Sequence, residues 1–331
     1  MAARNSIRGR GRGAWLHARK VKRRTKLHPL ELVVSVIFLA VLLLAVIGPL
    51  IAPFPTQTAN PLIRLLAPSG HHWLGTDENG MDIFSRILAA PRTDVVIAVI
   101  ATLISVAIGA PLGVIAGYFE GSKRRVASAM GELILRLLDV FQSFPVFIFA
   151  MVLVAVRGSS TTNIIAAVAF VNMPVFVRLV RSEIVSLRER PYAEAARAVG
   201  NSDLQIAFKH LLPNALPPII VQISVTVGFA ILLTAGLSFV GAGIAPPTPE
   251  LGSMVSTGAK FMITGQWWAS LFPGIALGVI VFTFGVIGEL VGRALEPGGG
   301  DEIDDEAAMA DMAFSIKIGG GTPETHLSGG A

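Results

Sequence analysis

The chain has 331 residues, of which 53% are hydrophobic and 15% are charged, and its mean hydropathy is +0.66. A soluble globular protein carries about 25% charged residues, so this chain has too few charges to cover a water-facing surface. It contains no cysteine, which excludes disulfides, thiol nucleophiles and thiolate metal sites. The six histidines are scattered and form no HExxH pattern, so we expect no metal site. The composition predicts a membrane protein.

The amino-terminal residues 1–31 form a basic arm with ten Lys or Arg and a single acid, Glu31. A basic arm can bind nucleic acid, but this one is followed at once by the apolar run Leu32–Ala52, which is long enough to cross a ~30 Å hydrocarbon core. We therefore interpret the arm as a topology signal and expect no nucleic-acid partner. A signal peptide would have a shorter apolar region of roughly 7–15 residues, so we expect this first helix to be uncleaved.

Six apolar runs predict an all-α, polytopic membrane protein with six transmembrane helices. The fourth run, Ile164–Val177, is short for a membrane span, and Leu179 and Val180 would complete it. With the basic arm inside the cell, 22 of the 27 Lys and Arg lie in cytoplasmic segments, as the positive-inside rule requires. Both termini are therefore expected in the cytoplasm. The six runs are Leu32–Ala52, Val95–Tyr118, Leu137–Val156, Ile164–Val177, Ile219–Val240 and Leu271–Ile287.

The second run carries small residues at four-residue spacing: Ser105, Gly109, Gly113 and Gly117. Small residues on one helix face let two backbones approach closely, so this stripe predicts a helix-packing surface. It indicates a helix bundle and identifies no substrate.

Few ionisable residues lie within the predicted spans. Asp139 has Arg136 three residues before it, and Glu289 has Arg293 four residues after it. Residues at these spacings face each other on a helix, so we expect interfacial ion pairs rather than a proton relay.

The segment at 241–270 is predicted to be an external cap or a re-entrant element that does not cross the membrane. It contains Pro246 and Pro247, which restrict the backbone and end a helix. The following stretch, Leu251–Ile263, favours a short amphipathic helix.

The cytoplasmic loop between the fourth and fifth runs favours two short helices. The first, Tyr192–Val199, ends at Gly200, which we expect to have a positive φ. The second begins at a capping box of Ser202 and Gln205 and is expected to stop at Pro213. This pair of helices is a candidate docking element for a partner.

The same loop, about residues 181–218, resembles the EAA loop of the membrane subunits of binding-protein-dependent ABC importers. The resemblance lies in Glu194-Ala195-Ala196, then Gly200, then Leu212-Pro213. One position departs from the general pattern, which prefers isoleucine where this chain has His210. The peptide-permease branch of the family commonly has histidine there, so the chain is similar to that branch.

Other stretches, in the same order as in that branch, extend the resemblance to about residues 30–297. They are His72–Asp82, Gly117-Tyr118-Phe119, Leu138-Asp139 with Pro145, and Leu237–Gly241 followed by Pro246–Pro249. By this pattern the chain looks like the second permease subunit of a dipeptide or oligopeptide importer.

The resemblance implies a type I ABC importer permease fold in a bacterial plasma membrane. It divides the chain into the arm 1–31, a first helix and external segment 32–94, a five-helix core 95–297, and an acidic, glycine-rich tail 298–331. The implied partners are a second homologous permease, two ATPase subunits, an external substrate-binding protein and the lipid bilayer. The residues implied to couple the chain to the ATPases are Glu194, Ala195, Ala196, Gly200, His210, Leu212 and Pro213.

The chain is not expected to be an enzyme, and it is assigned no catalytic residue and no cofactor of its own. It has no GxxxxGK[ST] motif, so ATP and Mg²⁺ would be bound by the partner ATPases. Nickel and glutathione permeases share the same motifs and remain alternative cargo classes. A secondary transporter or channel would also have six spans, but it would favour an unpaired carboxylate at membrane depth. An intramembrane enzyme would need a catalytic constellation that the spans do not offer.

Overall fold

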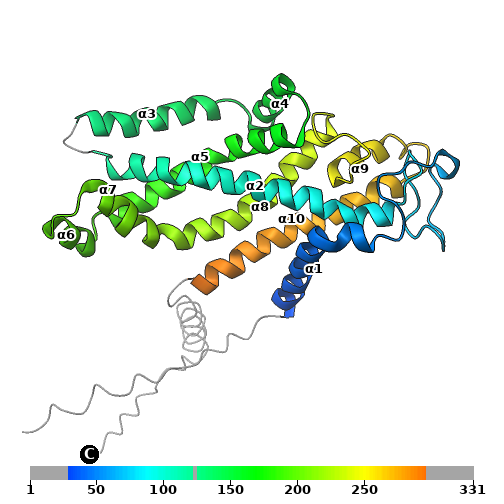
Figure 1. The fold of residues 1–331 in the computed structure, drawn as a ribbon, viewed down its shortest axis with the longest axis horizontal. Helices are drawn as coiled ribbons and strands as arrows, with labels where there is room; N and C mark the ends of the chain where they lie inside the picture. The colour runs from blue at the N-terminus through cyan, green and yellow to red at the C-terminus, as the bar shows by residue number, and fades with distance from the viewer. Residues whose placement is uncertain (1–28, 122–124, 296–331) are drawn as a thin grey trace, which may run out of the picture.

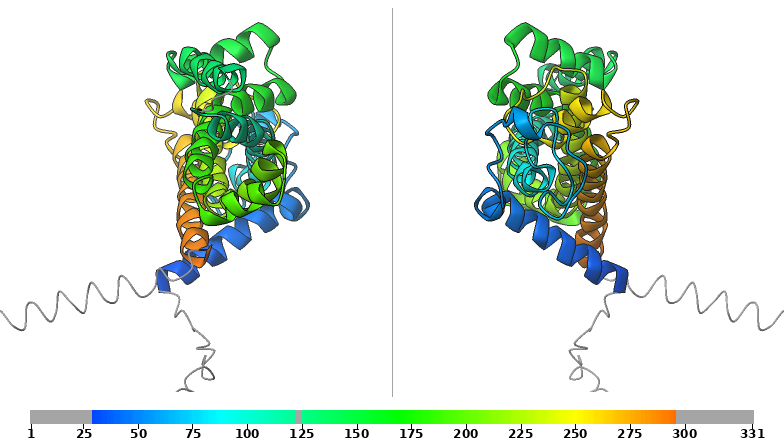
Figure 2. Two further views of the ribbon diagram at one scale, coloured as in Figure 1. Left: turned by 90° about the vertical axis from the view of Figure 1, so that its left-hand side faces the viewer. Right: turned by 90° about the vertical axis from the view of Figure 1, so that its right-hand side faces the viewer.

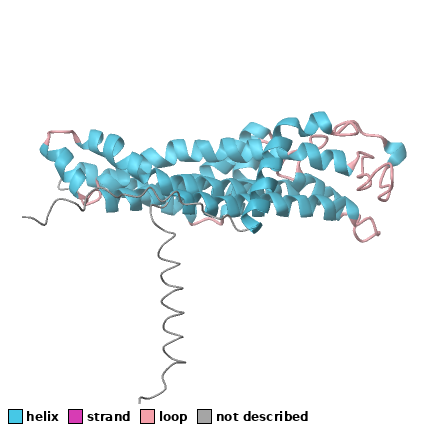
Figure 3. Cartoon of the chain, turned by 90° about the horizontal axis from the view of Figure 1, so that it is seen from below, coloured by secondary structure: helices cyan, strands magenta, loops and turns pink. Residues whose placement is uncertain are grey.

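The computed structural model describes residues 29–121 and 125–295 (Figure 1). Most of the basic arm and all of the acidic tail lie outside the described residues. Within the described part all regular secondary structure is helical, with no strand (Figure 3). The α-helices are α1 (Pro29–Ile51), α2 (Ile83–Tyr118), α3 (Arg125–Gln142), α4 (Val146–Arg157), α5 (Thr161–Leu187), α6 (Pro191–Ala198), α7 (Asp203–Gln205), α8 (Leu216–Phe239), α9 (Leu251–Ala259) and α10 (Trp268–Leu295).

Five helical stretches are long and apolar enough to cross a membrane, and a bent pair of helices would make a sixth. The five correspond to α1, α2, α5, the continuous stretch Asp203–Phe239, and α10. The all-α, polytopic fold predicted from the sequence is therefore confirmed.

The third predicted span, Leu137–Val156, is not one straight helix. It is divided between α3 and α4, whose axes meet at 88°. Pro145 lies at the break, with an extended ψ of 126°. Proline disfavours the helical conformation at the residue before it, so α3 ends at Gln142 and α4 starts anew after Pro145.

Two helices are longer than their apolar runs because polar caps set their starts. The Asp82 carboxylate accepts a hydrogen bond from the Ser85 backbone N–H at 2.8 Å, so α2 begins at Ile83 rather than at Val95. Ser160 caps α5 in the same way, through the Asn163 N–H at 3.2 Å. Both hydrogen bonds satisfy donors that a bare helix end would leave unpaired. As a result, charged residues that precede the second apolar run lie on α2 itself.

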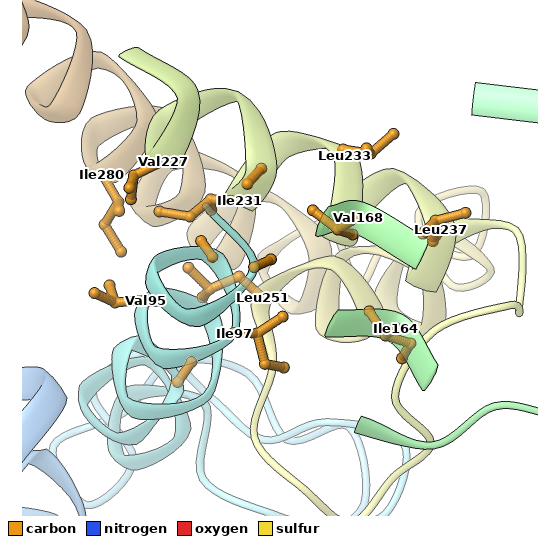
Figure 4. Packing of buried hydrophobic residues seen from close by; sticks show 14 of the residues in the cluster. Val95, Ile97, Ile164, Val168, Val227, Ile231, Leu233, Leu237, Leu251 and Ile280 are labelled. Carbon is orange, nitrogen blue, oxygen red and sulfur yellow. The ribbon is translucent and has the colours of Figure 1, made fainter. Parts of the chain in front are cut away.

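The main core lies where α2, α5, α8 and α10 meet, and α9 packs into it from one end (Figure 4). It is built from branched aliphatic and small side chains that exclude water. The labelled members are Val95 and Ile97 of α2, Ile164 and Val168 of α5, Val227, Ile231, Leu233 and Leu237 of α8, Leu251 of α9, and Ile280 of α10.

The stripe of small residues on α2 faces α5 along its whole length. A Cβ added to Gly109, Gly113 or Gly117 would lie 2.9, 2.7 or 2.7 Å from a backbone carbonyl oxygen of α5. The hydroxyl of Ser105 donates to the Ala169 carbonyl of α5 at 2.8 Å. The two backbones are thus so close that no side chain fits between them at the three glycines.

The predicted ion pairs form with different partners. Arg178 of α5 pairs with Asp139 at 2.7 Å, while Arg136 pairs with Glu132, one turn earlier on α3, at 2.6 Å. Arg293 of α10 pairs with Glu31 of α1, where the ends of these two helices converge (Figure 2). The expected pairs were wrong, because Asp139 and Arg293 each pair with a residue of a neighbouring helix and Arg136 pairs with an acid one turn earlier on its own helix.

We expect Gly113→Ala to destabilise the protein by about 1–3 kcal/mol, because the added methyl group would overlap a backbone oxygen and the helices would have to separate. Gly278→Ala on α10 is the matched control, since a Cβ there meets nothing within 4 Å. Thermal unfolding of the two variants in detergent measures the difference. Equal midpoints for both variants would contradict the close approach of α2 and α5.

Candidate coupling loop

The loop that carries the EAA-like residues lies at one end of the helix bundle. Figure 1 shows α6 and α7 at that end, while α9 and the segment between α1 and α2 lie at the opposite end. The first helix of the loop, α6, starts at Pro191. Proline suits the first turn of a helix because its missing N–H is not needed there. The loop connects α5 directly to α8.

The turn between α6 and α7 is tightly specified by the backbone. The Gly200 N–H donates to the Arg197 carbonyl at 3.0 Å and the Asn201 N–H donates to the Ala196 carbonyl at 3.2 Å, the two hydrogen bonds of a Schellman motif. Gly200 has a φ of +92°, the left-handed region that glycine tolerates. The positive φ expected at this position is therefore observed.

The second helix of the loop begins as predicted and continues further than predicted. Ser202 and Gln205 form the expected reciprocal capping box. Pro213 was expected to end the helix, but the chain stays helical into α8 by widening into a π-helical stretch (Ile206–Leu211) and then tightening into a 3₁₀ turn (Leu212–Ala215).

The change of helix type explains how Pro213 is accommodated. In a regular helix its ring would clash with a carbonyl one turn earlier. In the π-helical stretch the Leu212 N–H instead donates to the Ala207 carbonyl. The His210 carbonyl accepts a hydrogen bond from the Asn214 side chain at 2.6 Å, which supplies a donor to this part of the helix.

The inner face of the loop is apolar and buried against the bundle. Ala193 of α6 and Ile206, Ala207 and Leu211 of the second helix are buried. They pack in one cluster with residues of α2, α5 and α8, which are Ala110, Val114, Val180, Ile184 and Ile219. The loop is therefore packed onto the bundle. Its exposed outer face is backed by these buried apolar side chains.

The structure places the predicted coupling residues on both sides of this loop. Glu194, Ala195, Gly200 and Pro213 are exposed, whereas Ala196, His210 and Leu212 are half-buried. A Cβ built at Gly200 meets nothing within 4 Å, so its outer side is open. Glu194, Ala195 and Gly200 lie on α6 and at the turn that follows it, whereas Pro213 lies further along, in the 3₁₀ turn.

Two apolar residues at the tip of the loop were missed by the sequence analysis. Val199 is 83% exposed and Leu204 is 56% exposed, on either side of the turn at Gly200. An open cavity of about 690 Å³ lies beside Leu204 and is lined by Phe119, Val126 and Met130 as well as by the turn. Apolar side chains beside the cap positions Gly200 and Ser202 were the signal in the sequence, because a capped turn on the surface normally carries polar residues.

At the end of α2 far from the loop, the buried Arg86 joins the segment between α1 and α2 to the segment between α8 and α9. The Arg86 guanidinium donates to the Thr56 and Pro247 carbonyls at 2.9 Å each and lies 3.5 Å from the Asp77 carboxylate. Two turns along the same helix face, the Asp94 carboxylate accepts a hydrogen bond from the Leu251 N–H at 3.3 Å. The segment between α1 and α2 and the segment 241–270 are thereby fixed to α2.

Burial raises the pKa of two acids in these segments, Asp77 and Glu250. Desolvation raises the pKa of Asp77, and the Met81 N–H and the Arg86 charge oppose that rise. Desolvation also raises the pKa of Glu250, while the Ser253 N–H, which it caps at the start of α9, lowers it. Both acids have structural partners, so they organise the cap rather than form an exposed binding site.

The described chain is a bundle of apolar helices with one bent helix pair and a two-helix loop packed at one end. A profile of the family "Binding-protein-dependent transport system inner membrane component" matches residues 109–298, more than half of the chain. The chain belongs to this family. It is a permease component of a binding-protein-dependent ABC importer.

The chain is similar to permease proteins of two kinds of transport system, one for dipeptides and one for glutathione. A dipeptide transport system permease protein of Alkalihalophilus pseudofirmus is 38% identical over 283 residues, which is 86% of this chain and 90% of the relative. A glutathione transport system permease protein of Pectobacterium atrosepticum is 38% identical over 230 residues, which is 70% of this chain and 74% of the relative.

A solved structure supports the fold. An inward-facing structure of the methionine ABC transporter MetNI superposes with a TM-score of 0.51 at 21% identity, covering 62% of this chain and 94% of that chain. The type I importer permease fold implied by the sequence motifs is confirmed.

We expect Gly200→Val to strain the turn by about 1–2 kcal/mol, since a side chain with a β-carbon disfavours positive φ. Gly200→Asn is the matched control, because asparagine tolerates this region better. The strained variant should insert into the membrane normally, yet its loop should be cleaved faster by added protease. Equal protection of the two variants would contradict a required positive φ at this turn.

Proposed function

We propose that the loop from α6 through α7 docks onto separate ATPase subunits, and that ATP hydrolysis occurs only on those subunits. The observation that carries this proposal is the pair of exposed apolar residues, Val199 and Leu204, at the tip of a loop whose inner face is packed. A rigid support with an apolar tip favours binding to a preformed groove, since little ordering is needed on association. Glu194 and Ala195 extend the same exposed surface along α6.

The loop end of the bundle is proposed to face the cytoplasm. Six Lys and Arg lie in residues 178–218, whereas Lys260 alone lies in the cap at 241–270. This asymmetry supports an orientation with the loop inside and the cap outside. The apolar, largely exposed face of α1 suits contact with lipid or with another membrane helix.

The proposed cargo is di- or oligopeptides, carried along a path that this chain forms with a second permease subunit. Support comes from the relatives that are dipeptide permeases and from the histidine at position 210, typical of the peptide branch. A substrate-binding protein outside the membrane would deliver the peptide. A glutathione permease has the same 38% identity to this chain as the dipeptide permease, over a shorter stretch of 230 residues. Glutathione is therefore the second candidate cargo.

Docking is tested by placing a charge on the apolar tip. We expect Val199→Asp or Leu204→Asp to reduce the ATPase subunits that copurify with the permease by about tenfold, since burying one apolar side chain contributes about 1.5–3 kcal/mol. Ile263→Asp is the control, because Ile263 is 96% exposed and follows α9, which Figure 1 shows at the opposite end of the bundle from the loop. If both tip variants keep as much ATPase as the control, the docking surface lies elsewhere.

Cargo is tested by deleting the chain from cells that depend on peptides for amino acids. We expect growth on dipeptides to be lost and growth on free amino acids to continue, because no other subunit would complete the path. Uptake of labelled dipeptide, glutathione and nickel measures the selectivity directly. Normal peptide uptake together with failed glutathione or nickel uptake would move the chain to another cargo branch.

A further inference from the structure

Tyr118, the last residue of α2, contacts both helices of the coupling loop. Its hydroxyl donates a hydrogen bond to the Asp203 carboxylate in α7 at 3.0 Å. Arg197 of α6 interacts with the same hydroxyl. One side-chain atom on α2 therefore meets a residue from each half of the loop.

The end of α2 that carries Tyr118 is itself firmly held by α5. The Arg188 guanidinium donates to the Gly117 carbonyl at 3.1 Å and to the Glu120 carbonyl at 2.6 Å. Arg181 pairs with the Glu120 carboxylate at 2.7 Å. Cations at a helix carboxyl end satisfy carbonyls that lack partners and oppose the helix dipole. The Tyr118 side chain therefore projects from a helix end that is held in place by hydrogen bonds and an ion pair.

The same helix continues without a break to the external cap. α2 has 36 residues, which at 1.5 Å per residue is about 54 Å. Its far end carries Arg86, bonded to the Pro247 carbonyl, and Asp94, bonded to the Leu251 N–H. The loop and the cap, at opposite ends of the bundle in Figure 1, are therefore both attached to one helix.

The π-helical stretch of the loop also contacts α2 through buried apolar residues such as Ile206 and Ala207. Apolar contacts are non-directional and allow the surfaces to slide, whereas a hydrogen bond to a carboxylate has a defined direction and length. We propose that Tyr118 is a positioning residue for transport: its bond to Asp203 fixes the coupling loop on α2, so that a displacement of the loop moves α2 and the cap with it. This inference rests on the proposed docking function of the loop.

The test is the number of ATP molecules hydrolysed per peptide imported, measured on the complete transporter in proteoliposomes. Tyr118→Phe removes only the hydroxyl, and we expect it to raise this ratio about three- to tenfold, the range that one hydrogen bond is worth. The ATPase subunits should still copurify in full. Asp203→Ala should have the same effect, while Asp203→Asn keeps an oxygen acceptor and should restore most of the coupling.

The double variant distinguishes a shared bond from two separate effects. If Tyr118 and Asp203 act through one bond, Tyr118→Phe combined with Asp203→Ala should be no worse than either alone. Glu132→Gln is the control for loss of an acid, because Glu132 is exposed on α3 and pairs only within that helix in the described structure. It should leave the ratio unchanged.

Three results would overturn the proposal: an unchanged ratio in Tyr118→Phe, additive effects in the double variant, or loss of the ATPase subunits from Tyr118→Phe. The last would make Tyr118 part of docking rather than of transmission. Failure of the docking proposal is separate, since it would appear as full ATPase retention by Val199→Asp and Leu204→Asp whatever the coupling of the Tyr118 variant.

Discussion

The close approach of α2 and α5 is the constraint on which the rest of the structure depends. Three glycines leave no side chain between the two backbones, so carbonyl oxygens of α5 lie against the α2 surface, and the Ser105 hydroxyl donates to one more of them. Close-packed helices in a membrane gain stability from dispersion contacts rather than from the hydrophobic effect. Because α5 leads directly into α6, this contact also sets where the loop stands relative to α2.

The loop combines a buried inner face with an exposed tip. Its inner residues belong to one apolar cluster with three long helices, and its turn is closed by a Schellman motif and a capping box. These contacts leave the loop few ways to deform, so a force applied at its tip would be passed on to the long helices. The proposed docking would need this property, because binding of an ATPase at the loop would have to change the packing of helices far from it.

Much of the local structure was predictable. Apolar runs indicated the spans, and Gly200, Ser202 and Gln205 indicated the turn, because each signal acts within a few residues. Predictions failed where a distant element decided the outcome. Asp139 pairs with Arg178 of α5 rather than with Arg136 of its own helix. The prediction at Pro213 failed for a local reason, because the helix continues through it by widening into a π-helical stretch. The 88° bend between α3 and α4 follows from Pro145, whose effect on direction depends on what the flanking helices pack against.

The sequence by itself determined the membrane environment, the helical class, the family and the existence of a two-helix loop, since composition, periodicity and caps are local properties. Only the tertiary structure decided which residues of that loop face outward, why Val199 and Leu204 are exposed, and which side chains join the loop to α2. The hydrogen bond from Tyr118 to Asp203 spans 85 positions in the chain. No pattern of local spacing encodes such a contact, because it exists only when packing of the helices brings the two ends together.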